Sequence, residues 1–330
     1  MNFLLQAEEV EGLRQYLQAK KWIAPDEQIS SVSKPGEGNM NLTLRVRTNF
    51  RSFILKQSRD YVEKYPSIPA PRERAIIEGR FYELVQEDME IRSYTPEITF
   101  LDEENSIIFL EDLGESSDFS FVYKDGKEIE EEDLKEIMHF ISILHQRFPI
   151  GIADGDFTNR GMRELNTEHI FRYPLMEENG FDLNTVTEGL QEIAMTYKTD
   201  AAFKAKVDQL SALYTEDGDT LLHGDYYPGS WLKSWQGVKI IDPEFCFFGP
   251  ASFDISVTIA HLMMAEQSPT RVDQVMEFYD ASPRFVEAEL WPLVGVEITR
   301  RLIGLAQLPL SIDLAKKEQL LKEAYKMIMA

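Results

Sequence analysis

The sequence predicts an α+β fold with two lobes: a small N-terminal lobe, made of an antiparallel sheet with a helix, and a mostly helical C-terminal lobe. Two observations lead to this prediction. Segments with strand-like alternation and short turns gather near the start of the 330 residues, and helical periodicity dominates the remainder. The length also suits about two domains, at roughly 100–200 residues for each. We place the lobes at residues 1–112 and 113–330.

The N-terminal lobe is expected to begin with an amphipathic helix, because apolar residues recur at helical spacing among acids. A strand hairpin follows, with its turn at 47–51, and the three prolines within 65–71 exclude a helix interior there. The predicted helices span residues 5–20 and 72–86, and the predicted strands span 29–46, 52–56, 98–101 and 107–110.

The C-terminal lobe is expected to be helical except between residues 220 and 248, where short strands flank a turn at 235–237. Pro292 is expected to start or kink the last long helix, because proline cannot donate a backbone hydrogen bond. The predicted helices span 131–146, 186–213, 253–264, 272–279 and 286–306.

The composition indicates a folded protein with a strong acidic excess. Hydrophobic residues make up 43% and charged residues 28%, and 34 basic against 57 acidic residues give a net charge of −23. This field repels phosphate backbones and anionic lipids, so we expect no nucleic-acid or membrane partner. The single Cys246 cannot form an internal disulfide and is expected to be buried. With no signal peptide or spanning segment recognised, we expect a cytoplasmic protein.

A glycine-containing turn interrupts the first predicted hairpin. Its candidate residues, Gly36, Gly38, Asn39 and Asn41, would let a loop lie close to phosphates, so that backbone N–H groups can donate to them. A two-glycine hairpin is more often simply a turn. It is not a Walker A loop, because no lysine and Ser/Thr pair follows.

A lysine closes the next strand. Lys56 is followed 22 residues later by Glu78 on the predicted helix, the pairing with which kinases hold the α- and β-phosphates. Glu73 or Glu83 could replace Glu78 as the partner. An isolated strand-end lysine is more often simply solvated.

The strongest motif is His223-Gly224-Asp225, which lies after an apolar pair and before the predicted hairpin over 231–241. Kinase catalytic loops place a metal-binding asparagine five positions after the catalytic aspartate, and here that position is Ser230. Asp242 and Glu244 follow the hairpin at a spacing that can turn both carboxylates to one side. Hard carboxylate oxygens suit Mg²⁺, so order and spacing together favour a phosphotransferase site.

Taken together, these motifs resemble those of the 5-methylthioribose kinases, which belong to the aminoglycoside phosphotransferase and choline kinase group with its protein-kinase-like fold. The resemblance also covers 248–250, 253–255 and the Arg300-Arg301 segment, and runs from about residue 34 to 306. Ser230 and the Asp242-Pro243-Glu244 sequence are its most specific details.

The resemblance implies a role for each candidate residue. Asp225 would be the catalytic base. Independently of the resemblance, we expect His223 to brace the loop of Asp225 and Asp254 to hydrogen-bond the backbone of that loop, with no need for either to touch the substrate. Asp242 and Glu244, with Ser230 at the remaining metal position, would hold Mg²⁺. The ATP-binding residues would be Gly36, Gly38, Asn39, Asn41, Lys56 with Glu78, and the hinge Glu111 to Leu113, and the sugar-binding residues would be Arg300 and Arg301.

The sequence thus predicts an ATP-dependent kinase acting on a hydroxyl of a small sugar-like acceptor, with 5-methylthioribose as the first choice. A kinase for another small alcohol, such as an aminoglycoside, a choline-like amino alcohol or another sugar, is the alternative, followed by a nucleotide-binding pseudokinase. Three departures from the resemblance bear on the acceptor: a shorter chain, the segment 226–228, and no match ahead of 151–163. The resemblance also implies a homodimer.

Overall fold

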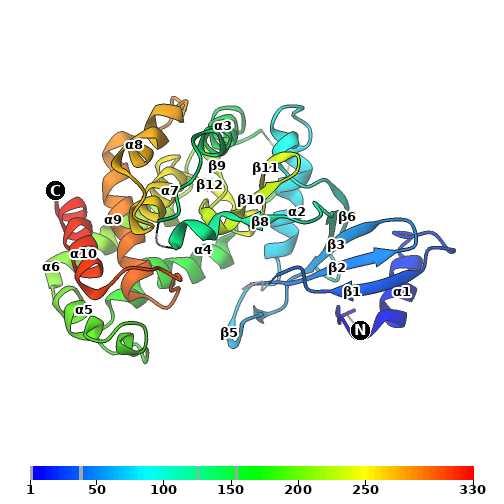
Figure 1. Ribbon diagram of the computed structural model, residues 1–330, viewed down its shortest axis with the longest axis horizontal. Coiled ribbons are helices and arrows are strands. Elements are labelled where there is room, and N and C mark those ends of the chain that lie inside the picture. The colour runs from blue at the N-terminus through cyan, green and yellow to red at the C-terminus, as the bar shows by residue number, and fades with distance from the viewer. Residues whose placement is uncertain (1–2, 37–39, 125, 153–154) are drawn as a thin grey trace. The chain divides into compact units, whose positions relative to one another are not determined.

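The structure is a computed structural model that describes residues 3–36, 40–124, 126–152 and 155–330 (Figure 1). The chain divides into two compact units. Unit 1 comprises residues up to Ser116 together with Ile241–Phe245, and unit 2 comprises Ser117–Ile240 and Cys246–Ala330. The short segment Ile241–Phe245 therefore belongs to unit 1, although the residues before and after it in the sequence belong to unit 2. The placement of the two lobes at residues 1–112 and 113–330 stays a prediction.

Unit 1 contains a five-stranded antiparallel sheet in the order β1-β2-β3-β7-β6. Its strands and helices are β1 (Ile29–Ser33), β2 (Leu42–Thr48), β3 (Ser52–Gln57), β6 (Ile98–Asp102), β7 (Ile107–Glu111), the small hairpin β4 (Tyr61–Val62) and β5 (Tyr65–Pro69), α1 (Val10–Ala19), α2 (Arg74–Val85), and the 3-10 turns η1 (Ile91–Tyr94) and η7 (Pro243–Phe245).

The two faces of this sheet carry different residues because strand side chains alternate. Phe53, Leu55 and Phe109 point into the hydrophobic core that also contains Leu13 and Leu17 of α1. The intervening residues of β3 and β7 lie on the opposite face, which α2 covers. Gly79 makes that approach possible, because a Cβ there would lie 3.0 Å from the Ile108 side chain. Lys56 pairs with Ile108 across the strands and is therefore placed beneath α2.

Unit 2 is mostly helical, with two small antiparallel sheets in the orders β11-β10-β8 and β12-β9. Its α-helices are α3 (Glu131–Arg147), α4 (Arg160–Thr167), α5 (Leu190–Lys198), α6 (Ala201–Thr215), α7 (Ser252–Met264), α8 (Pro269–Phe278), α9 (Glu287–Ile303) and α10 (Leu314–Met329). Its strands are β8 (Ser117–Asp118), β9 (Thr220–Leu222), β10 (Trp231–Ser234), β11 (Gly237–Ile240) and β12 (Phe247–Gly249), and its short helical turns are η2 (Phe119–Tyr123), η3 (Glu168–Arg172), η4 (Tyr173–Leu175), η5 (Leu183–Thr185) and η6 (Pro228–Ser230).

Helices α7 and α9 form the centre of unit 2, and most of their residues are buried. Helix α10 packs against α9, as the neighbouring orange and red ribbons of Figure 1 show. The close approach depends on Gly295, because a Cβ at this position would lie 2.7 Å from the backbone oxygen of Ala324. The helix that carries Arg300 and Arg301 is therefore held firmly within the core.

The α+β fold, with an antiparallel sheet in the N-terminal part and a mostly helical remainder, is confirmed. Several boundaries were predicted wrongly. Residues 5–9 are not helical, because the backbone of Leu5 donates to Gln57 Oε1 at 2.8 Å and ties this segment to the sheet. The expected helix 186–213 is divided into α5 and α6, because Asp200 caps a new helix through the backbone N–H groups of Ala202 and Phe203.

Other differences are smaller. Pro292 lies inside α9, which ends at Ile303 rather than at residue 306, and α8 begins at Pro269 instead of residue 272. Elements α4, α10, β4, β5 and β8 were not predicted. Cys246 is buried, as expected. Within the described ranges of the chain, no helix combines the length and the apolar character that crossing a membrane requires.

Candidate active site

Unit 1 contains a group of charged side chains around Lys56. The Lys56 side chain is 6% exposed, and its Nζ lies 2.6 Å from Glu78 Oε1 of α2 and 2.5 Å from Asp242 Oδ1. Among the three glutamates that the sequence offered, the structure therefore pairs Glu78 with the lysine. We call Lys56, Arg74, Glu78, Asp242 and Glu244 the Lys56 cluster.

Burial and the neighbouring charges set the protonation of this cluster. Burial by itself would lower the pKa of Lys56, but Asp242 and Glu78 outweigh it and raise that pKa above its ordinary value. Burial raises the pKa of Glu78 despite its contact with the lysine. Burial likewise raises the pKa of Glu244 to about 8, against the opposing effect of Lys56 and Arg74. The cluster thus contains more carboxylate groups than its two cations, Lys56 and Arg74, can fully stabilise in the charged form.

Asp242 and Glu244, the two predicted metal-binding carboxylates, lie in the segment Ile241–Phe245, which belongs to unit 1 although it is distant in sequence from the rest of that unit. Asp242 adopts a left-handed backbone conformation with φ of 63°, unusual for a residue with a side chain, and its N–H donates to the Tyr82 hydroxyl at 3.1 Å. Such strained positions are concentrated at functional sites. Glu244 is buried, and its Oε2 accepts from Asn41 Nδ2 at 3.0 Å.

Arg74 was not predicted as a site residue. Its fully buried guanidinium donates to Asn41 Oδ1 at 2.8 Å and lies 3.4 Å from Glu244 Oε2. It also donates to the backbone oxygens of Met40, Arg59, Tyr61 and Pro71. Arg74 thereby fixes the backbone on both sides of the small hairpin and orients Asn41. No local pattern in the sequence signals this role, because its partners come from four separate segments of the chain.

The remaining candidates for nucleotide binding that the structure describes make none of the contacts given above for the Lys56 cluster, apart from Asn41. Gly36 is exposed, with open space around it, and Gly38 and Asn39 lie outside the described residues. Glu111 ends β7 and Leu113 follows it, half-buried. The roles of this loop and hinge stay predictions.

Unit 2 contains a second charged group, which begins at the loop after β9. Asp254 of α7 accepts hydrogen bonds from the backbone N–H of His223 at 2.7 Å and of Gly224 at 2.9 Å. This is the backbone contact that the sequence predicts for Asp254. Gly224 has φ of 84°, a conformation that favours glycine. Asp254 therefore fixes the turn that presents Asp225, and Ser230 Oγ donates to the Asp225 carbonyl at 2.9 Å.

Arg300 and Arg301 both reach the Asp225 carboxylate. The Nη2 atoms of Arg301 and Arg300 lie 3.2 Å and 3.6 Å from Asp225 Oδ1. Burial raises the pKa of Asp225, although the two arginines act in the opposite direction. A carboxylate that is partly exposed, fixed in place and raised in pKa has the properties of a general base.

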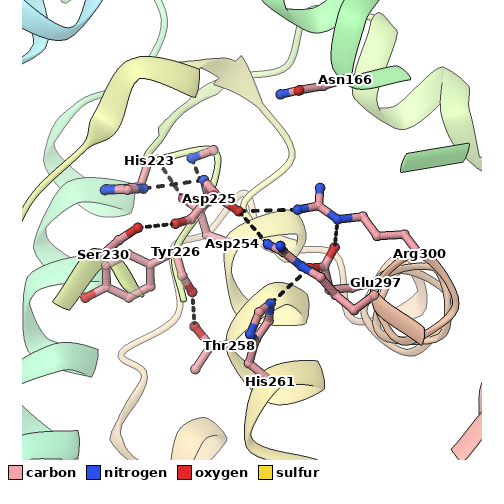
Figure 2. Close-up of polar contacts among 12 residues, drawn as sticks. Asn166, His223, Asp225, Tyr226, Ser230, Asp254, Thr258, His261, Glu297 and Arg300 are labelled. Carbon is pink, nitrogen blue, oxygen red and sulfur yellow. Dashed lines mark hydrogen bonds and ion pairs between the residues drawn. The ribbon is translucent and has the colours of Figure 1, made fainter. Parts of the chain in front are cut away.

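Glu297 and His261 complete this group and were not predicted. Glu297 Oε1 accepts from Arg301 Nε at 2.7 Å and lies 3.0 Å from His261 Nε2. Figure 2 shows His261, Glu297 and Arg300 gathered on one side of Asp225. The helical spacing of Glu297 from the arginine pair is a signal that the sequence contained. We call Asp225, His261, Glu297, Arg300 and Arg301 the Asp225 cluster.

Tyr227 lies beside this cluster. Its ring centroid is 5.1 Å from the Arg301 guanidinium carbon, a cation–π distance. A Cβ on Gly229 would come within 2.5 Å of the same tyrosine, so glycine is needed for the ring to lie there. The segment 226–228, noted above as a departure from the resemblance, therefore contributes a side chain next to Asp225.

Asp242 and Glu244 offer the hard oxygen atoms that Mg²⁺ prefers, and the Asp242 side chain is 45% exposed. Across the described ranges, no group of three or more His, Cys, Asp or Glu side chains is arranged to hold a metal. Two carboxylates suit an ion such as Mg²⁺, which beside nucleotides usually takes the rest of its coordination from phosphate and water.

Comparison with known proteins agrees with this chemistry. Residues 122–290 match the model of the phosphotransferase enzyme family that is abbreviated APH. The chain belongs to this family. It is thus a phosphotransferase, and the sequence prediction of an enzyme of this class is confirmed.

Similar curated proteins are named methylthioribose kinase. The relative from Exiguobacterium sibiricum is 28% identical over 285 residues, covering 82% of this chain and 72% of that protein. A relative from Bacillus cereus is 27% identical over 275 residues, covering 79% of this chain and 69% of that protein. These relatives, which match over most of the chain, carry the name of the family that the sequence motifs resemble.

Two solved structures share the fold at low sequence identity. Choline kinase from Streptococcus pneumoniae aligns over 97% of this chain and 98% of its own, with a TM-score of 0.53 and 14% identity. Spectinomycin phosphotransferase, solved with ADP and spectinomycin, aligns over 98% and 99%, with a TM-score of 0.53 and 13% identity. Both confirm the expected protein-kinase-like fold of the aminoglycoside phosphotransferases and choline kinases.

Proposed function

We propose that this phosphotransferase moves the γ-phosphoryl group of ATP to a hydroxyl group of a small sugar-like acceptor, with 5-methylthioribose, at its anomeric oxygen, as the first candidate. The observation that carries the proposal is the contact of Asp225 with Arg300 and Arg301. A carboxylate that can accept a proton then stands beside guanidinium groups that can donate to sugar oxygens. The names of the curated relatives supply the candidate sugar.

In the proposed reaction, Asp225 orients the acceptor hydroxyl and receives its proton. The hydroxyl oxygen forms a bond to the γ-phosphorus while the bond from that phosphorus to the β–γ bridging oxygen breaks, so that ADP leaves and a phosphate ester forms. Arg300 and Arg301 would hold the acceptor in place for this attack. Positioning and electrostatics supply most of the rate enhancement in phosphoryl transfer.

The Lys56 cluster would serve the nucleotide. Lys56, oriented by Glu78, would bind the α- and β-phosphates, together with the loop from Gly36 to Asn41, and the hinge Glu111 to Leu113 would pair with adenine. Asp242 and Glu244 would hold Mg²⁺, with Ser230 as a further predicted ligand. When bound, this ion neutralises charge on the phosphate oxygens.

A panel of acceptors in an ADP-release assay tests the proposal. It contains 5-methylthioribose, ribose, choline, ethanolamine and an aminoglycoside, each with Mg²⁺ and ATP, and phosphorus NMR identifies the product. We expect kcat/KM to be highest for 5-methylthioribose and the product to be its 1-phosphate. Preferential phosphorylation of the amino alcohols or of the aminoglycoside would overturn the assignment of the acceptor. ATP binding without turnover of any acceptor would support a pseudokinase.

A further inference from the structure

Adjacent arginines on a helix do not naturally point the same way. Each residue of an α-helix is rotated by about 100° from the one before, so Arg300 and Arg301 leave α9 in different directions. Both nevertheless bring a guanidinium group to Asp225 Oδ1. Something must turn these two long side chains toward one point.

Glu297 occupies the position on α9 from which both arginines can be held. It precedes Arg300 by three residues and Arg301 by four, the two spacings that place side chains on one helix face. Its Oε2 lies 3.0 Å from Arg300 Nε, and its Oε1 lies 2.7 Å from Arg301 Nε. The carboxylate thus accepts a hydrogen bond from Arg301 Nε and forms an ion pair with Arg300 Nε, and the outer Nη2 atoms extend to Asp225.

Glu297 is itself fixed from the neighbouring helix α7. His261 Nε2 lies 3.0 Å from Glu297 Oε1, and His261 Nδ1 lies 2.5 Å from the Tyr123 hydroxyl. Burial lowers the pKa of His261 to about 4, so the ring is neutral at pH 7. Burial opposes the charge on Glu297, but the two arginines outweigh it and hold the pKa of Glu297 below its usual range. Hydrogen-bond matching then assigns the proton to Nε2, with Tyr123 donating to Nδ1.

We propose that Glu297 is a positioning residue, which holds Arg300 and Arg301 together on the side of α9 where Asp225 lies and so assembles the acceptor site. This rests on the proposed function. Glu297 touches neither Asp225 nor any reacting atom in this scheme, and it acts through the arginines. Its loss should therefore impair use of the acceptor and leave use of the nucleotide unchanged.

Steady-state kinetics of the full-length chain test the proposal. The variants are Glu297→Gln, which removes the charge at nearly constant size, Glu297→Asp, which keeps it, and Glu287→Gln as a matched control at an exposed position of the same helix. We expect Glu297→Gln to lower kcat/KM for the acceptor by about 10- to 100-fold, since hydrogen bonds to charged groups are the strong ones. Glu297→Asp should recover part of this loss, and KM for ATP should not change.

Two outcomes would overturn the positioning role: a loss no larger than that of the control, or an equal loss of nucleotide and acceptor use, which indicates general destabilisation. A second measurement does not depend on turnover. In the wild type, NMR should show slow water exchange of the Arg301 Nε–H, assigned with Arg301→Lys, and Glu297→Gln should accelerate it. If no acceptor is phosphorylated, the proposed function fails, but the exchange rate of the Arg301 Nε–H still shows whether Glu297 holds Arg301 in position. Unchanged exchange in Glu297→Gln would contradict it.

Discussion

The Lys56 cluster and the Asp225 cluster are both charged and largely buried, but their charges are balanced differently. In the Lys56 cluster two cations face three carboxylates, and burial raises the pKa of two of these carboxylates. In the Asp225 cluster two arginines face two carboxylates; burial raises the pKa of Asp225, but the arginines hold the pKa of Glu297 below its usual range. One cluster is short of positive charge, whereas the other is balanced by its own side chains.

This difference suits two kinds of ligand. A group of carboxylates with too few cations is stabilised by a divalent ion, which is often the largest local charge in such a site. A balanced group has less need of a charged ligand, in agreement with the neutral sugar-like acceptor proposed above. The overall charge of −23 does not distinguish these two environments, because it is distributed over the whole chain.

The largest expected effect comes from removing the proton acceptor of the Asp225 cluster. Asp225→Asn keeps the size of the side chain but cannot take the proton of the acceptor hydroxyl, so we expect kcat to fall by roughly 10²–10⁴-fold. Circular dichroism and the melting temperature should show a folded protein. Asp273→Asn, at an exposed position of α8, is the control and should behave as the wild type. A near-normal kcat in Asp225→Asn would refute the assignment of the base.

Lys56→Met tests whether the stability and the nucleotide binding of the Lys56 cluster depend on the lysine charge. The change leaves Glu78 buried without its partner, and breaking a buried pair typically costs about 3–5 kcal/mol of stability. We expect a lower free energy of unfolding and a KM for ATP raised about 10-fold or more, because a charged hydrogen bond to phosphate is lost. Urea denaturation and kinetics measure both effects.

The double variant Lys56→Met/Glu78→Gln separates the two effects. It removes the unpaired carboxylate, so stability should recover while the KM for ATP stays high. If stability does not recover, the cost of Lys56→Met comes from packing rather than from charge.

Parts of this comparison were predictable from sequence, and parts were not. Lys56 and Glu78 were found because a strand lysine and a helix glutamate stand in a known order, and Asp225 because His-Gly-Asp precedes a hairpin. The choice of Glu78 over Glu73 or Glu83 required the structure, since it depends on how α2 is rotated on the sheet. Arg74 could not be found, because its partners are brought together only by folding. Glu297 was visible in the helical spacing but was overlooked.

The metal dependence of the Lys56 cluster provides the next prediction. Chelation with EDTA should abolish phosphoryl transfer and added Mg²⁺ should restore it. Asp242→Asn should raise the half-saturating Mg²⁺ concentration by about 10-fold or more, since even supporting contacts typically change metal affinity by 10–100-fold. Asp26→Asn, exposed in unit 1, is the control and should leave the Mg²⁺ requirement unchanged. An Asp242→Asn titration that overlays the wild-type curve would show that this carboxylate does not hold the ion.

The smallest expected effect concerns acid stability, which the neutral His261 links to the Asp225 cluster. The pKa of His261 is about 4 in the folded chain, against an ordinary value of 6.5. Between these values the unfolded chain binds more protons, so the free energy of unfolding falls as the pH is lowered from about 6.5 toward 4.

Replacing His261 by glutamine removes this titration and should make the decline in stability between pH 6.5 and pH 5 smaller by about 1–2 kcal/mol, at 1.36 kcal/mol per pKa unit. Urea denaturation of each variant at several pH values measures the slope, so a constant loss of stability from the substitution itself does not interfere. His139→Gln, at an exposed position of α3, is the matched control and should keep the wild-type slope. An unchanged slope in His261→Gln would mean that His261 carries a proton in the folded chain. Glu297 would then face three cationic groups instead of two, and the Asp225 cluster would carry a positive charge in place of the balance that distinguishes it from the Lys56 cluster.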